Sequence, residues 1–144
     1  MLLNGRCHCG NISFELKWAG DPAAMPARAC GCSFCVKHGG VWTSDPDSSL
    51  IVTIRDAALV SKYAFGTRTA TFHVCSHCGA VPLVTSEIAN ELYAVVNVNA
   101  LEEIDRLRVD RAPANFESED AESRLARRKR NWIADVRITS REES

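Results

Sequence analysis

Polar and apolar residues alternate with a period of two along much of the chain. In the stretch 11–18, the apolar residues Ile12, Phe14, Leu16 and Trp18 share one face. This pattern is typical of a strand with one buried side. Further strands are predicted over 41–43, 50–54, 58–65, 69–74, 80–85 and 91–98. With a packed segment over 132–138, the total is about eight strands, so we predict a mainly β fold.

Other stretches carry turn, loop or helix signals. Residues 19–29 contain glycine and proline and are interpreted as a loop, and 66–67 as a hairpin turn. A single helical turn is predicted over 100–104. Residues 118–130 predict a short C-terminal helix with Ser118 as its N-cap, because acidic residues begin the stretch and arginines end it.

Length and composition favour one globular unit. The chain has 144 residues, 46% of them hydrophobic and 24% charged, and no long linker divides it, so we treat 1–144 as one domain. The formal net charge of −1 gives no support for a polyanionic partner. No apolar run approaches the roughly 20 residues that span a bilayer, and the first residues lack a secretory signal. We therefore expect no membrane partner.

The cysteines carry the chemical signal. All seven fall into three short clusters, which are Cys7 and Cys9, then Cys30, Cys32 and Cys35, then Cys75 and Cys78. Thiolates one or two residues apart can converge on one metal ion. Zinc takes four such ligands in closed structural sites, and three plus an open position in many catalytic sites. Since seven is four plus three, the sequence predicts two zinc ions per chain, one closed and one open.

Three other uses of the cysteines fit less well. A disulfide framework is disfavoured by the odd cysteine count and by clusters too tight to bridge themselves. The spacings differ from those of common iron–sulfur proteins. A thioredoxin-like redox motif needs a βαβ setting, which the strand pattern does not supply. Metal-ready, reduced cysteines suit a reducing compartment, so we predict a cytoplasmic protein.

Spacing leaves open which cysteines share an ion. Cys32 and Cys35 could join Cys75 and Cys78, as in a zinc ribbon, although the stretch 36–74 is long for one. In the other grouping, the first and third clusters form the closed site. Residues 30–35 then supply three ligands from six consecutive positions and leave one side of the ion bare.

The three clusters in this order resemble the glutathione-dependent formaldehyde-activating enzyme family, also called the Gfa-like or centromere protein V-like domain. The matching stretches begin at Gly5, Cys30 and Cys75, and the resemblance covers about residues 3–110, with 111–144 as an extension packed on that core. It implies a β-tent of antiparallel sheets. It also implies a structural zinc on Cys7, Cys9, Cys75 and Cys78, and a catalytic zinc on Cys30, Cys32 and Cys35.

The same resemblance implies a carbon–sulfur lyase that joins formaldehyde and glutathione to S-hydroxymethylglutathione, or reverses that reaction. The expected partner is a small thiol such as glutathione, bound as thiolate at the open three-cysteine zinc. A homo-oligomer is compatible with the sequence. The alternative is a non-catalytic, zinc-stabilised module that binds protein or nucleic acid.

Several other residues suggest secondary roles. Lys37 and His38 could orient substrate or transfer protons, but a solvated lysine and a surface histidine are the default. Trp42 and Phe34 could wall a pocket, with core packing as the default. The basic run 124–130 is interpreted as a solvated helix end, because acidic residues precede it. We therefore expect no nucleic-acid partner, and contact of some arginines with an anionic substrate is the other interpretation.

Overall fold

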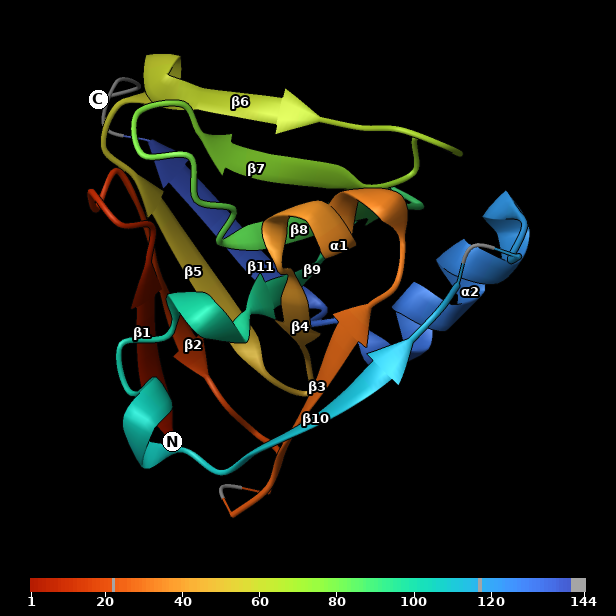
Figure 1. Cartoon of the computed structure of the whole chain (residues 1–144), viewed down its shortest axis with the longest axis horizontal. Coiled ribbons are helices and arrows are strands. Elements are labelled where there is room, and N and C mark those ends of the chain that lie inside the picture. The colour runs from red at the N-terminus through yellow and green to blue at the C-terminus, as the bar shows by residue number, and fades with distance from the viewer. Residues whose placement is uncertain (22, 117, 141–144) are drawn as a thin grey trace.

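Two β-sheets form the framework of the protein (Figure 1). The computed structural model describes residues 1–21, 23–116 and 118–140. The smaller sheet has the order β1-β2-β5-β11. Its strands are β1 (Leu2–Arg6), β2 (Ile12–Lys17), β5 (Ser49–Ile54) and β11 (Asp135–Ser140). β1 and β2 form an antiparallel hairpin, and β2 also pairs with β5 in antiparallel orientation. β11 pairs with the other side of β5 in parallel orientation.

The larger sheet has seven strands in the order β10-β3-β4-β9-β8-β7-β6. They are β3 (Met25–Cys30), β4 (Val41–Thr43), β6 (Val60–Tyr63), β7 (Thr71–Cys75), β8 (Leu83–Ile88), β9 (Glu91–Asn97) and β10 (Val109–Ala114). All its pairs are antiparallel except β3 with β10. Figure 1 shows that β3 leads into α1, and that β10 runs beside β3 toward α2.

Helical segments are few and short. The α-helices are α1 (Ser33–His38) and α2 (Ala121–Asn131), and 3₁₀ turns cover η1 (Ala57–Leu59), η2 (Val98–Ala100) and η3 (Ile104–Arg106). None of the described helices is both long and apolar enough to cross a membrane.

The main core lies between the two sheets. Leu16 and Val52 from the smaller sheet pack in one apolar cluster with Leu83 and Val96 from the larger sheet. Cross-strand fit is close within the first hairpin, where the ring of Phe14 lies over Gly5 so tightly that a Cβ at Gly5 would overlap it. This contact explains why the strand carries a glycine there.

A second apolar cluster covers the opposite face of the larger sheet. Successive residues of β9 point to opposite faces, so Ala94 belongs to the inter-sheet core while Tyr93 and Val95 belong to the outer cluster. Trp42 of β4 and Trp132 after α2 complete this outer layer. Burial on both faces explains the nearly continuous apolar run in β9.

The prediction of a mainly β fold with a short C-terminal helix is confirmed. The predicted antiparallel sheets need one correction, because each sheet also holds one parallel pair. The C-terminal helix begins at Ala121 and is capped by Asp120, whose carboxylate accepts a hydrogen bond of 2.8 Å from Ser123 N. The prediction of Ser118 as N-cap was therefore wrong.

Three strands and one helix were not predicted. β3 lies inside the stretch 19–29 that was interpreted as a loop, while β1 and β10 received no assignment. Pro26 masks the strand pattern of β3, yet its carbonyl accepts a hydrogen bond from Thr43 Oγ1. The six residues of α1 were interpreted as part of a metal-binding loop, since cysteine spacing alone does not distinguish a loop from one helical turn.

Candidate functional site

Four cysteines meet where the β1–β2 hairpin approaches the turn between β7 and β8. Cys7 and Cys9 lie between β1 and β2, Cys75 ends β7, and Cys78 lies in the following turn. Their sulfur atoms all lie within 4.8 Å of one another, and we call this group the quartet. The Sγ of Cys9 is 3.8 Å from that of Cys7 and 3.5 Å from that of Cys75. The quartet therefore connects the two sheets.

Each turn that carries the quartet is closed by a glycine. Gly10 N donates to Cys7 O at 3.1 Å, and Gly79 N donates to Cys75 O at 2.7 Å. Both glycines have positive φ values, 85° and 81°, which glycine adopts without steric cost. These tight turns aim neighbouring thiols at one point.

The other three cysteines gather at the junction of β3 and α1. Cys30 ends β3, Cys32 is the N-cap of α1 and Cys35 lies inside it, and their sulfur atoms also lie within 4.8 Å of one another. We call them the triad. Cys32 Sγ accepts a hydrogen bond of 3.3 Å from Cys35 N, and Cys35 Sγ accepts one of 3.4 Å from Trp42 Nε1. The helix cap and the indole thus fix two of the three sulfurs.

Both groups contain a thiol that ionises easily. The hydrogen bond from Cys35 lowers the pKa of Cys30 to about 5, while the same contact raises the pKa of Cys35. Burial raises the pKa of Cys78, but backbone hydrogen bonds from Ala80 and Cys9 and contacts with the thiols of Cys75 and Cys7 together lower it to about 6. Such thiols are thiolates near neutral pH, which is the form that binds metal.

The donor sets fit a soft divalent metal. Four thiolates at a zinc–sulfur distance of about 2.3 Å place tetrahedral sulfurs about 3.8 Å apart, and the quartet distances agree with this spacing. The triad offers the same donor type with one position fewer. Both groups therefore fit metal ions and are consistent with zinc.

No histidine among the described residues belongs to either group. His8 and His77 are exposed, and each lies between two cysteines of the quartet. His73 is buried on β7, where its Nε2 pairs with Thr85 Oγ1 at 2.8 Å.

A cavity of about 290 Å³ opens directly beside the triad. All three triad cysteines line it, and so do aromatic side chains that include Trp42, Phe72 and Trp132. Trp42 therefore both packs in the outer layer and walls a pocket, whereas Phe34, Lys37 and His38 do not line this cavity. His38 instead packs against the ring of Phe34 at 4.5 Å.

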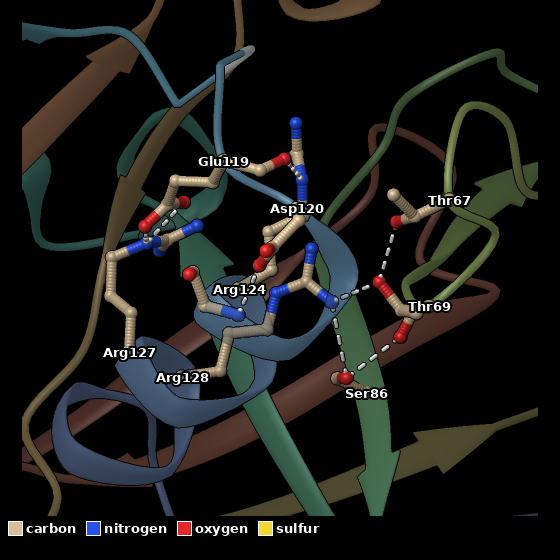
Figure 2. Close-up of polar contacts among 9 residues, drawn as sticks. Thr67, Thr69, Ser86, Glu119, Asp120, Arg124, Arg127 and Arg128 are labelled. Carbon is tan, nitrogen blue, oxygen red and sulfur yellow. Dashed lines mark hydrogen bonds and ion pairs between the residues drawn. The ribbon is translucent and has the colours of Figure 1, made fainter.

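Four arginines form another wall of this cavity. Arg28 comes from β3, and Arg124, Arg127 and Arg128 come from α2. Figure 2 shows the three α2 arginines together, with Arg128 beside Thr69. Arg128 is only 5% exposed, so the prediction of a fully solvated helix end was wrong at this position.

Sequence reasoning missed Arg28 and Trp132 as pocket residues. Arg28 lies in the stretch 19–29 that was interpreted as a loop, two positions before Cys30. A strand assignment there would have placed Arg28 and Cys30 on the same face. For Trp132, the chain offers no local signal, because its place depends on how α2 docks on the sheet.

A family model described as glutathione-dependent formaldehyde-activating enzyme matches residues 2–117. The chain belongs to this family. The match includes all seven cysteines and Arg28, whereas α2 and β11 lie after it. The family membership and the two cysteine groups together describe a Gfa-like protein that can bind metal.

The fold is also similar to that of a Rhodobacter sphaeroides protein, whose crystal structure was solved as a Northeast Structural Genomics target. The two share 25% sequence identity with a TM-score of 0.50. The comparison covers 94% of this chain and 99% of that chain, so it extends beyond the part matched by the Gfa family model.

One prediction concerns the indole at the triad. Replacing Trp42 with phenylalanine removes the donor to Cys35 Sγ while retaining an aromatic ring. We expect zinc affinity at the triad to fall about tenfold, as is usual when a hydrogen bond to a metal ligand is lost, with the quartet unaffected. Competition with a chromophoric chelator measures both affinities.

Trp132→Phe is the matched control. Trp132 lines the same cavity, but within the described part of the chain it has no hydrogen bond to a cysteine. Equal losses in both variants would show that ring size, and not the donated hydrogen bond, controls the triad.

Proposed function

We propose that this protein is a zinc-dependent carbon–sulfur lyase acting on the adduct of a thiol and a small carbonyl compound, such as S-hydroxymethylglutathione. The observation that carries the proposal is the position of the triad in the wall of a cavity of small-molecule size. Ligand sites commonly have volumes of roughly 300–1,000 Å³, and this cavity lies at the lower limit. Family membership supplies the reaction class.

The two cysteine groups take different roles in this proposal. Cys7, Cys9, Cys75 and Cys78 hold a structural zinc, since four ligands complete its coordination. Cys30, Cys32 and Cys35 hold a second, catalytic zinc and leave one position toward the cavity. When bound there, zinc supplies a positive centre that favours the thiolate form of a substrate thiol.

The chemistry balances without an external oxidant or reductant. In the cleavage direction, the C–S bond breaks and its electron pair stays on sulfur. The hydroxyl oxygen of the adduct loses its proton as the carbonyl forms, and one proton is taken up by the thiolate on release. Trp42, Phe72 and Trp132 give the cavity an apolar wall. The arginines offset negative charge on the substrate.

No acidic residue or histidine is among the described residues that line the cavity. Lys37 and His38, the candidates for proton transfer, lie outside it as well. Proton exchange with solvent through the mouth of the cavity is therefore part of the proposal. The seven reduced thiols suit a cytoplasmic location, which also belongs to the proposal. The proposal also treats residues 1–144 as one domain.

Exchange spectroscopy tests the reaction directly. Zinc-loaded protein is added to an equilibrium mixture of formaldehyde and glutathione, and magnetisation transfer between the adduct and free formaldehyde is measured by NMR. We expect the exchange rate to rise in proportion to protein concentration. Free zinc chloride at the same concentration is the control.

Exchange no faster than in the zinc control, with this and other thiols, would contradict the lyase proposal. It would favour the alternative of a zinc-stabilised module that binds protein or nucleic acid.

A further inference from the structure

The wall of the triad cavity carries more positive charge than the described residues around it neutralise. Arg28, Arg124, Arg127 and Arg128 all line the cavity, and none of its described lining residues is an aspartate or glutamate. The Cys30 thiolate offsets only part of this charge. Glu119 pairs with Arg127 at 3.0 Å from outside that lining. Burial, and then the charges of Arg127 and Arg124, lower the pKa of Arg128 to about 10, so these neighbouring cations add to the cost of burying its charge. An anion in the cavity would relieve this repulsion.

Arg128 is held in place and still has an unused donor. Its Nη1 donates to Thr69 Oγ1 at 2.8 Å and to Ser86 Oγ at 3.3 Å (Figure 2). Its guanidinium carbon lies 5.1 Å from the ring centroid of Trp132. The Nε of this side chain is fully buried and has no hydrogen-bond partner among the described residues. Buried donors normally have an acceptor, so the unpaired Nε adds to the cost of burying this charge and favours an anion near the guanidinium.

Arg127 is also fixed before any ligand binds. Its guanidinium lies over the ring of Phe116, 3.6 Å from the centroid. Its Nε donates to both carboxylate oxygens of Glu119, at 3.0 and 3.3 Å. An arginine held in this way loses little conformational freedom when its remaining donors meet an anion.

Much of the remaining lining is apolar and includes Phe65, Phe72, Val84 and Val95. A ligand with an apolar body therefore fits these side chains better than the polar peptide of glutathione does. A planar carboxylate matches the fork of an arginine.

We propose that the cavity selects a thiol whose apolar body ends in a carboxylate, which Arg127 and Arg128 bind. The inference rests on the proposed function for the thiol end and names the substrate class of that site. Both arginines belong to α2, which follows the part matched by the family model. Selection of the substrate is thus assigned to the C-terminal extension.

Two probes without a thiol measure the preference for a carboxylate, and the arginine variants below separate binding at α2 from binding to the triad zinc. 3-Phenylpropionate has an apolar body and a carboxylate, and 3-phenylpropionamide is its uncharged match. Isothermal titration calorimetry with the full zinc-loaded chain should show at least about tenfold tighter binding of the carboxylate. Equal binding of the two probes would overturn the proposal, and tighter binding of 2-phenylethylphosphonate would overturn the assignment to a carboxylate.

Variants then locate the charge that is responsible. Arg127→Gln should remove most of the preference for the carboxylate and leave amide binding unchanged. Arg128→Lys retains the charge but not the planar fork, so the preference should fall only in part. Arg130→Gln makes the same charge change on an exposed position of α2 and should have no effect. An equal effect of Arg130→Gln and Arg127→Gln would overturn the proposal, since it would indicate general electrostatics.

These results are independent of the lyase assay. If exchange of the glutathione adduct is absent while the carboxylate preference is present, the proposed function fails and the anion subsite remains. If exchange is present and the preference for the carboxylate is absent, the proposed function stands and the anion subsite is ruled out.

Discussion

Replacement of Cys75 with serine is expected to release one metal ion per chain and to unfold the protein. Cys75 is fully buried at the end of β7, and its sulfur lies 3.5 Å from that of Cys9 in the other sheet. Structural zinc contributes about 10–16 kcal/mol in small zinc domains. Since whole domains are stable by only about 5–15 kcal/mol, this loss is comparable to the total. Elemental analysis and thermal unfolding followed by circular dichroism measure the two effects.

His77→Ala is the matched control in the same turn. His77 lies between two quartet cysteines but is exposed and belongs to neither cysteine group. It should retain both the metal content and the melting temperature of the wild type. A Cys75→Ser chain that loses metal yet melts at the wild-type temperature would show that the quartet does not hold the sheets together.

The quartet shows why the cysteines were predictable while the strand pairing was not. Tight cysteine spacing reports local geometry, because the turns closed by Gly10 and Gly79 bring neighbouring thiols together. Cys9 and Cys75 are 66 residues apart in the sequence, so the contact between their turns depends on the tertiary fold. Spacing alone left two groupings open, and the resemblance indicated the one in which the sulfurs now lie together.

Two of the missed strands, β3 and β10, pair with each other. β10 adds to the edge of the larger sheet, parallel to β3. Parallel pairing joins segments far apart in sequence, so no turn signal marks it. β10 also has few buried side chains, and its apolar pattern is correspondingly weak. After pairing with β3, the chain runs from β10 toward α2 (Figure 1). Three arginines of α2 line the cavity.

The role of α2 was the least predictable part of the site. Its sequence is strongly charged, and a helix with four arginines normally faces solvent. Arg128 is buried because Thr69 and Ser86 accept its hydrogen bonds and Trp132 covers its guanidinium. These partners come from three separate segments, so the burial of one particular arginine depends on the assembled fold.

The largest effect on activity is expected from Cys32→Ser. Cys32 is both a triad thiol and the N-cap of α1, where its Sγ accepts from Cys35 N. Serine is a preferred N-cap residue, so this variant retains the helix cap while removing one thiolate ligand. We expect metal content to fall by one ion per chain, with the melting temperature close to that of the wild type. The rate of adduct exchange should fall by more than about a hundredfold. Loss of a residue that only hydrogen-bonds to a metal ligand usually costs about 10–100-fold, and loss of the ligand itself should cost more.

Ser33→Ala is the control for Cys32→Ser. Ser33 is the exposed neighbour of Cys32 and does not line the cavity, so its loss should change neither metal content nor exchange. Because Cys32→Ser and Cys75→Ser each remove one thiol, their comparison separates the two sites. Metal loss with retained fold should follow only the triad variant, and unfolding only the quartet variant. Full activity of Cys32→Ser would contradict a catalytic triad, while unfolding of this variant would show that the triad is structural as well.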